Sequence, residues 1–206
     1  PKVLRPPQSS GDDPTLQSLE KYWQALRNAQ RIPSRNDIEP RQIDDALPHA
    51  FILQRVAPGI ARMSVAGQQL HDLLKMDARG MPLATFFVPE IQGKIAELVE
   101  DAFSTPAIVT IPLISTGNLL RHEVTGTMLL LPLRDGKGAT TRILGALVTN
   151  GVRGNRPRRF EIATDIPIRN DPLMPRLASV QGLVAPLKAK GPDAKRPALR
   201  IVVNNG

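Results

Sequence analysis

Four arginines stand within seven residues late in the chain: Arg153, Arg156, Arg158 and Arg159. Guanidinium groups bind phosphate oxygens through paired N–H donors, so this cluster could contact a nucleotide, a nucleic acid or an anionic lipid surface. Only Phe160 stands nearby as a stacking aromatic, and no helix-turn-helix or other base-reading element precedes the cluster. The simpler interpretation is a solvated basic segment, and phosphate binding is the alternative.

The three histidines are candidates for acid–base or metal chemistry. His122 stands beside Glu123 and could form an acid–base pair with it, although a solvated cross-strand position explains the pair equally well. His49 begins a predicted strand and is expected to point into solvent. With His71, these histidines show none of the spacings typical of metal ligands, so no metal site is predicted.

Signatures of acyl and phosphoryl transfer are missing from the sequence. Gly136-Lys137-Gly138 has no P-loop spacing around it and joins two predicted strands. The serines lie in no nucleophile elbow. Asp12-Asp13 and Asp44-Asp45 are adjacent pairs, which point about 100° apart on a helix and cannot work as a carboxylate dyad. We therefore expect no enzymatic activity.

Composition and charge further narrow the possible classes of function. The 206 residues include no cysteine, which excludes disulfides, thiolate metal sites and cysteinyl flavin adducts, and is typical of a cytoplasmic protein. No apolar run approaches the roughly 20 residues that span a bilayer. Residues 1–150 hold 16 basic and 15 acidic side chains, whereas residues 151–206 hold 11 and 4. The net charge of +8 therefore belongs to the end of the chain, where seven prolines also stand.

The hydrophobic pattern predicts helices and strands in an order that defines a fold class. Predicted helices cover residues 14–27, 68–75 and 89–104, and predicted strands cover 49–56, 60–65, 107–115, 119–133 and 140–149. Two strands, a helical crossover and three further strands make a five-stranded antiparallel sheet with helices on one face, of the α+β class. The predicted segments are a flexible N-terminus (1–13), a helical cap and linker (14–48), the core (49–150) and a flexible basic tail rich in proline (151–206).

Short sequence motifs, taken in their order along the chain, resemble those of one protein family. They are Tyr22-Trp23, Leu26-Arg27, Pro33 with Arg35 and Asp37, Pro40, Leu47-Pro48, Arg62, Ala66-Gly67, Gly80, Leu131-Pro132-Leu133 and Arg142-Ile143-Leu144-Gly145. Together they resemble the PAS-like domain family of alphaproteobacteria, over about Leu19 to Leu147, and residues 196–203 look like that family's usual end. The resemblance implies a stand-alone signalling protein with a PAS fold. Ser64 stands where the family often has a second arginine, which argues against an anion contact on this strand.

The resemblance also implies a place for a small ligand, between the inner face of the sheet and the short helices. The implied lining is Met63, Val65, Leu70, Leu74, Phe86, Thr127 and Leu129. A packed core needs the same residues and is the favoured interpretation, so the cofactor stays unknown. Haem-binding PAS domains use the helix before the third strand, and residues 89–104 contain no histidine. Haem is therefore not expected, and flavin is not expected because the chain has no cysteine for an adduct.

The predicted first helix carries the only tryptophan and the only tyrosine. Leu19, Tyr22, Trp23 and Leu26 recur at helical spacing and form a face that must be buried, either by the chain's own sheet or by a second chain. We expect this face to be the homodimer or partner surface. The predicted function is a non-enzymatic cytoplasmic sensory module that contacts a signalling protein. Nucleic acid is not expected as a partner, and the alternative is a nucleotide- or nucleic-acid-binding regulator that uses the Arg153–Arg159 cluster.

Overall fold

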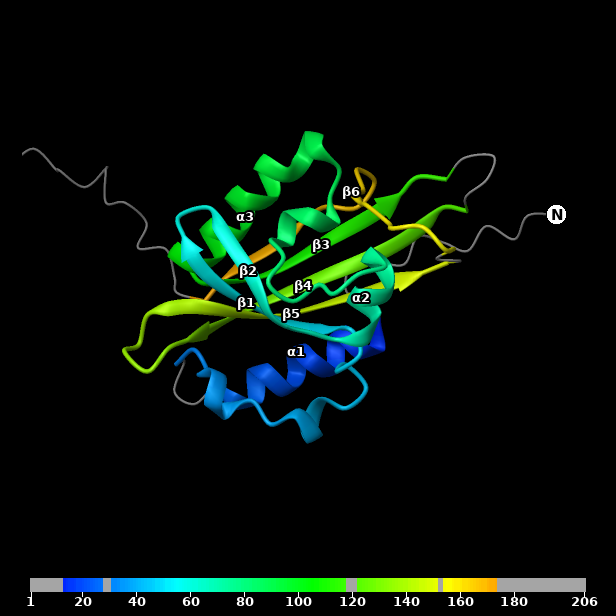
Figure 1. The fold of residues 1–206 in the computed structure, drawn as a ribbon. Helices are drawn as coiled ribbons and strands as arrows, with labels where there is room; N and C mark the ends of the chain where they lie inside the picture. The colour runs from blue at the N-terminus through cyan, green and yellow to red at the C-terminus, as the bar shows by residue number, and fades with distance from the viewer. Residues whose placement is uncertain (1–12, 28–30, 118–121, 152–153, 174–206) are drawn as a thin grey trace, which may run out of the picture. The chain divides into compact units, whose positions relative to one another are not determined.

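An antiparallel sheet organises the computed structural model (Figure 1), which describes residues 13–27, 31–117, 122–151 and 154–173. These residues all belong to one compact unit, Pro1–Pro175. In the described ranges the sheet has seven strands: β1 (Ala50–Ala57), β2 (Ile60–Ala66), β3 (Ala107–Ser115), β4 (Val124–Arg134), β5 (Thr140–Asn150), β6 (Glu161–Ile162) and β7 (Arg169–Pro172). Their order is β2-β1-β5-β4-β3-β6, and β7 also pairs with β3.

Helices complete the fold on both sides of this sheet. The α-helices are α1 (Pro14–Leu26), α2 (Gln68–Leu74) and α3 (Gln92–Ser104), and the short 3-10 helices are η2 (Arg35–Asp37), η3 (Pro40–Ile43), η4 (Leu83–Phe86) and η5 (Pro89–Ile91). No helix within the described ranges is long and apolar enough to cross a membrane. The predicted fold class is confirmed, with five long strands in the predicted order and the crossover helices between the second and the third.

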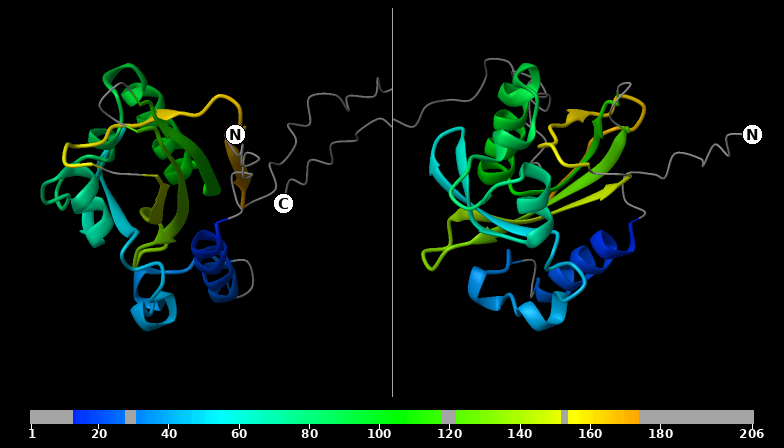
Figure 2. Two further views of the ribbon diagram at one scale, coloured as in Figure 1. Left: turned by 90° about the vertical axis from the view of Figure 1, so that its right-hand side faces the viewer. Right: turned by 45° about the vertical axis from the view of Figure 1, so that its right-hand side comes forward.

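Two hydrophobic clusters lie on opposite faces of the sheet. The face that carries α2, η4 and α3, here called the inner face, buries side chains such as Phe51, Leu70 and Phe103. The outer face carries α1 and the segment that follows it, and buries Trp23, Ile43 and Leu144 among others. Figure 2 shows α1 and the linker on the side of the sheet opposite α3. The sheet is therefore covered on both faces.

The first helix packs on its own sheet. Asp13 caps α1 by accepting hydrogen bonds from the backbone N–H groups of Thr15 and Leu16, and Pro14 occupies the first turn, where no N–H is needed. The Trp23 side chain is fully buried, and its Nε1–H donates to the carbonyl oxygen of Pro132 on β4 at 3.1 Å. The helix therefore buries its apolar face within the chain.

The chain from 154 to 173 departs from the flexible tail that the composition predicts. It forms β6 and β7, which pair with residues 107–110 and 113–114 of β3. The residues of β7, Arg-Asn-Asp-Pro, are half-buried or exposed and show no apolar alternation, so hydrophobic patterning cannot detect the strand. Pairing with the β3 edge satisfies their backbone groups instead.

The hairpin of β1 and β2 is tied to α3 through Glu100. Its carboxylate pairs with the Arg55 guanidinium and accepts a hydrogen bond from the Gly59 backbone N–H at 3.0 Å. The Gly59 hydrogen bond and the nearby Arg55 charge lower the pKa of Glu100 below its ordinary value of 4.5. A carboxyl with a lowered folded-state pKa stabilises the fold above its unfolded pKa, and this contribution is lost as the pH falls through the folded-state pKa.

The Glu100→Gln variant is expected to unfold more easily than the parent at neutral pH, with a difference that shrinks as the pH falls below 4.5. Urea titrations at several pH values measure this difference. Glu97→Gln, at an exposed carboxyl on the same helix, is the matched control. A Glu100→Gln difference that stays constant across the titration would contradict the ionic role.

Candidate functional site

The inner face brings together four of the seven residues of the predicted ligand site. Met63 comes from β2, Leu70 and Leu74 from α2, and Phe86 from η4, and all four are at most 4% exposed. The short helix α2 carries its two leucines four residues apart, which places both on the side that meets the sheet. These four side chains belong to one apolar cluster with Phe51, as the predicted core requires.

The other three predicted residues lie away from this cluster. Val65 is 46% exposed. Met63 pairs with Leu53 and Val65 pairs with Ile52, so Ser64 is an extra residue between these two pairs of β2 and β1. Ile52 is an outer-face residue. This bulge moves Val65 off the inner face. Leu129 belongs to the outer cluster, and Thr127, two residues earlier on β4, points to the same side.

The inner cluster offers apolar contacts. The buried polar side chains of the described residues are Thr110, Ser115 and Arg158. Phe51 lies so close over Gly145 that a Cβ at that position would overlap the ring. The cluster can hold an apolar group by dispersion and burial.

His71 holds α2 to the segment that follows it. Its Nδ1 accepts a hydrogen bond from the Ala78 backbone N–H at 3.0 Å, which assigns the ring proton to Nε2, and Nε2 donates to the Ala66 carbonyl oxygen at 3.2 Å. Asp77 lies 3.4 Å from Nδ1 and is itself paired with Arg79, whose hydrogen bonds hold the pKa of Asp77 well below its ordinary value. Both ring nitrogens therefore serve the local backbone.

The other two histidines are not brought together with acidic groups. His49 is half-buried, with Nδ1 3.3 Å from the Leu147 carbonyl oxygen, instead of pointing fully into solvent as predicted. His122 and Glu123 are both exposed at the start of β4. In the described part of the chain, no three side chains of the metal-binding types come together.

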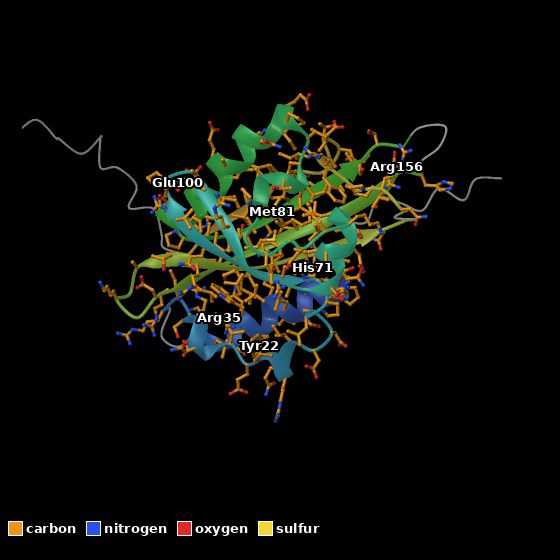
Figure 3. The ribbon with its side chains drawn as sticks, in the orientation of Figure 1. Tyr22, Arg35, His71, Met81, Glu100 and Arg156 are labelled. Carbon is orange, nitrogen blue, oxygen red and sulfur yellow. The ribbon has the colours of Figure 1, made fainter. Side chains whose placement is uncertain are left out.

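The arginine cluster is divided by the fold. Arg156 and Arg159 are exposed (Figure 3 labels Arg156), whereas Arg153 lies outside the described residues. Arg158 is only 3% exposed, and its Nη1 donates to the His122 carbonyl oxygen at 2.9 Å. The four arginines therefore do not form one exposed phosphate-binding surface.

The predicted partner surface on α1 is largely occupied by the chain itself. Leu19 and Trp23 are at most 1% exposed in the outer cluster, and Tyr22 and Leu26 pack partly against it. The Tyr22 hydroxyl accepts a hydrogen bond from the Glu39 backbone N–H at 2.8 Å and so holds the linker against the helix (Figure 3). These contacts favour a structural role for the face that the sequence assigns to a partner.

The β1–β2 hairpin carries three exposed apolar side chains. Val56, Ile60 and Val65, here called the hairpin residues, are 53%, 46% and 46% exposed. The outer cluster contains no residue of β2, so α1 leaves this strand uncovered. Exposed apolar side chains on an uncovered strand make this hairpin a candidate interaction surface. Sequence alternation could not identify these residues as exposed, because an apolar residue of a strand can lie on either face of the sheet.

A surface groove of about 210 Å³ lies between α1 and η3, on the outer side of the molecule. Its lining is mostly polar and consists of Thr15, Ser18, Leu19, Arg41, Gln42, Ile43, Asp44, Asp45 and Ala46. Asp44 and Asp45 stand at its rim and are both exposed, in agreement with solvated positions. The groove is separate from the inner cluster and contains none of its residues.

Comparison with known proteins gives one family match and several distant structural likenesses. A sequence profile of the family described as PAS domain matches residues 12–148. The light-state structure of the blue-light photoreceptor Aureochrome1 LOV is 14% identical, over 54% of this chain and 88% of that chain, with a TM-score of 0.40. A Light-Oxygen-Voltage domain studied with a flavin analogue is 19% identical, over 54% and 83%, with a TM-score of 0.39. The PAS domain of a protein from Colwellia psychrerythraea is 14% identical, over 52% and 93%, with a TM-score of 0.37. No curated protein matches the chain significantly.

These likenesses correct the expectation about flavin. That expectation depended on the missing cysteine, which excludes a cysteinyl adduct but not the binding of a flavin. The similar structures include Light-Oxygen-Voltage domains, one of them studied with a flavin analogue. The missing cysteine therefore does not exclude flavin as a ligand.

Proposed function

The chain belongs to the PAS domain family, and from this membership we propose that it is a non-enzymatic sensory module that acts through contacts with a partner protein. The observation that supports this proposal best is the exposure of the hairpin residues. Ile60 and Val65 lie on β2, which contributes no residue to the outer cluster, and Val56 lies near the end of β1. A second copy of the chain is the first partner to test, because an exposed sheet surface can pair with itself in a symmetric dimer.

Phosphate binding is not part of the proposal. Arg158 is committed to the His122 carbonyl oxygen, and only Arg156 and Arg159 of the cluster are exposed in the described ranges. The salt dependence of binding separates the two functions. Phosphate contacts weaken steeply with added salt because each contact releases counterions, whereas burial of apolar hairpin residues does not.

The double variant Ile60→Lys and Val65→Lys is expected to lower self-association at least tenfold, because it places two charges in a surface that must lose water on pairing. Its free energy of unfolding should change by about 0.5 kcal/mol or less, since both side chains are half exposed. Sedimentation velocity over a range of concentrations measures the association. Met76→Lys, at a residue 53% exposed outside the hairpin, is the control. A parent protein that stays monomeric, or a double variant that pairs equally well, would contradict the homodimer.

The sensory part of the proposal requires a signal, and a ligand on the inner face is the form to test first. Native mass spectrometry and a visible absorption spectrum of the freshly purified protein would show a retained flavin, haem or metabolite. A retained flavin could form no cysteinyl adduct, because the chain has no cysteine. A polypeptide of unmodified mass and no visible absorption would count against a tightly held chromophore and direct the search to a protein signal.

A further inference from the structure

Residues 158–173, here called the strap, pass from the inner face of the sheet across the β3 edge to the outer face (Figure 2, left, yellow to orange). At the inner end, the Arg158 backbone N–H donates to the Leu73 carbonyl oxygen on α2 at 2.8 Å. Phe160 makes two backbone hydrogen bonds to the end of η4 and the residues after it: its N–H donates to the Phe86 carbonyl oxygen, and its own carbonyl oxygen accepts from the Val88 N–H. The strap therefore begins on the helices that close the inner face.

Side-chain packing anchors the same end more firmly. The Phe160 side chain is fully buried in the inner cluster, and Ile162 and Ile168 pack partly against that cluster. A buried phenylalanine makes tens of favourable atomic contacts, so its position depends on how the cluster is filled. Any rearrangement of the inner cluster must therefore move the strap or break its packing.

The middle of the strap crosses the sheet edge through backbone pairing. Glu161 and Ile162 pair with Ile114 and Leu113 of β3, and the Ala163 N–H donates to the Pro112 carbonyl oxygen at 2.9 Å. The four residues of β7 then pair with residues 107–110. These bonds hold the strap on the edge strand in two places, at residues 161–163 and at residues 169–172.

The outer end of the strap is clamped to α1. The Arg169 guanidinium donates from Nη1 and Nη2 to the two carboxylate oxygens of Glu20, at 2.7 and 2.8 Å. Its Nε also donates to Asp171 at 2.6 Å, and the two carboxylates together raise the pKa of Arg169 above its ordinary value. Leu173 packs on the outer cluster beside the same helix. A forked arginine–carboxylate pair fixes direction as well as distance, so it can transmit a displacement.

We propose that the strap couples the inner face to α1, so that a change in the packing around Phe160 alters the stability of α1 on the opposite face through the Arg169–Glu20 clamp. Both ends consist of specific contacts, and β6 and β7 hold the segment between them on β3 in two places, which gives a physical path from the inner cluster to α1. The proposal goes beyond the sensory function, because it needs neither a ligand nor a partner. Its failure would leave that function untouched.

Hydrogen exchange of the backbone amides tests the coupling in the full chain. Phe160→Leu trims the inner end of the strap, and Phe103→Leu makes the same substitution in the same cluster on α3. We expect the amides of α1 to exchange about fivefold or more faster in Phe160→Leu than in Phe103→Leu. In a background with Arg169→Gln, which removes the clamp, this difference should disappear. Equal effects of the two leucine variants, or a difference that survives Arg169→Gln, would overturn the proposal.

Reciprocity provides a second test that needs no change in the core. Coupling between two sites acts equally in both directions, so Arg169→Gln alone should speed exchange at the amides of Phe160 and Val88 on the inner face. Arg79→Gln, which breaks an exposed ion pair away from the strap, is the matched control and should leave both amides unchanged. Unchanged exchange at both amides in Arg169→Gln would overturn the coupling.

Discussion

Trp23→Ala is expected to lower the free energy of unfolding by about 4 kcal/mol, the largest effect of any single truncation on α1. The indole is fully buried in the outer cluster, and its removal leaves a cavity between the helix and the sheet. The Pro132 carbonyl oxygen would also lose the Nε1–H donor that satisfies it. Chemical denaturation followed by circular dichroism measures the loss, since the only tryptophan is gone.

Two milder variants separate packing from hydrogen bonding at this position. Trp23→Phe keeps much of the apolar contact but leaves the buried Pro132 carbonyl oxygen without its donor, which costs about 1–3 kcal/mol. Tyr22→Phe removes one hydroxyl from an exposed contact with the linker and should cost about 1 kcal/mol or less. A Trp23→Ala protein as stable as Tyr22→Phe would show that α1 does not depend on the chain's own sheet for its burial.

The packing of α1 shows what the sequence could determine and what it could not. Helical spacing of Leu19 and Trp23 correctly predicts an apolar face, because amphipathic periodicity is local information. The surface that covers this face depends on residues about a hundred positions later, such as Pro132 on β4. Periodicity contains no such long-range information, so the sequence left open whether the sheet or a second chain buries the helix.

The inner-face residues show a second limit of sequence analysis, which cannot tell which face of the sheet a strand residue lies on. On β4 the run from Met128 to Leu131 is apolar at every position because both faces are covered, so alternation does not tell which side faces inward. On β2 the bulge at Ser64 changes the side of Val65. The strands themselves were predicted, whereas Thr127, Leu129 and Val65 were placed on the wrong face.

The strap shows a third limit of sequence analysis. A segment can become a strand because it pairs with another strand, even when its own sequence has no strand pattern. Its β7 residues are polar, and the basic, proline-rich composition around them predicts a flexible tail. What orders them is the open edge of β3 and the Glu20 carboxylate, both far away in the sequence. The signal that could have been used is Phe160 with Ile162, Ile166 and Ile168, four large apolar side chains within nine residues.

Gly67→Ala is expected to destabilise the fold by about 3 kcal/mol, although the backbone at Gly67 has a φ of −73° that any residue can adopt. A Cβ at this position would overlap the Leu47 carbonyl oxygen and lie 2.5 Å from that of Pro48. Both obstacles are backbone atoms, fixed by the Gly67 N–H donating to Ala50 and the Gln69 N–H donating to Pro48, each at 2.8 Å. Rotation of a side chain cannot relieve the overlap, so the start of α2 must move.

The same substitution at Gly93 is the matched control for this prediction. Gly93 lies in the first turn of α3 with open space around its Cα, so Gly93→Ala should raise the free energy of unfolding by about 0.5–1 kcal/mol through helix propensity. Urea denaturation compares the two variants, and exchange of the α2 amides reports whether the helix shifts. Because α2 supplies Leu70 and Leu74 to the inner face, a displaced α2 would loosen the inner cluster as well. Equal stability of Gly67→Ala and Gly93→Ala would contradict this prediction. It would show that the backbone at the junction of β2 and α2 can shift at a lower energetic cost than its contacts indicate.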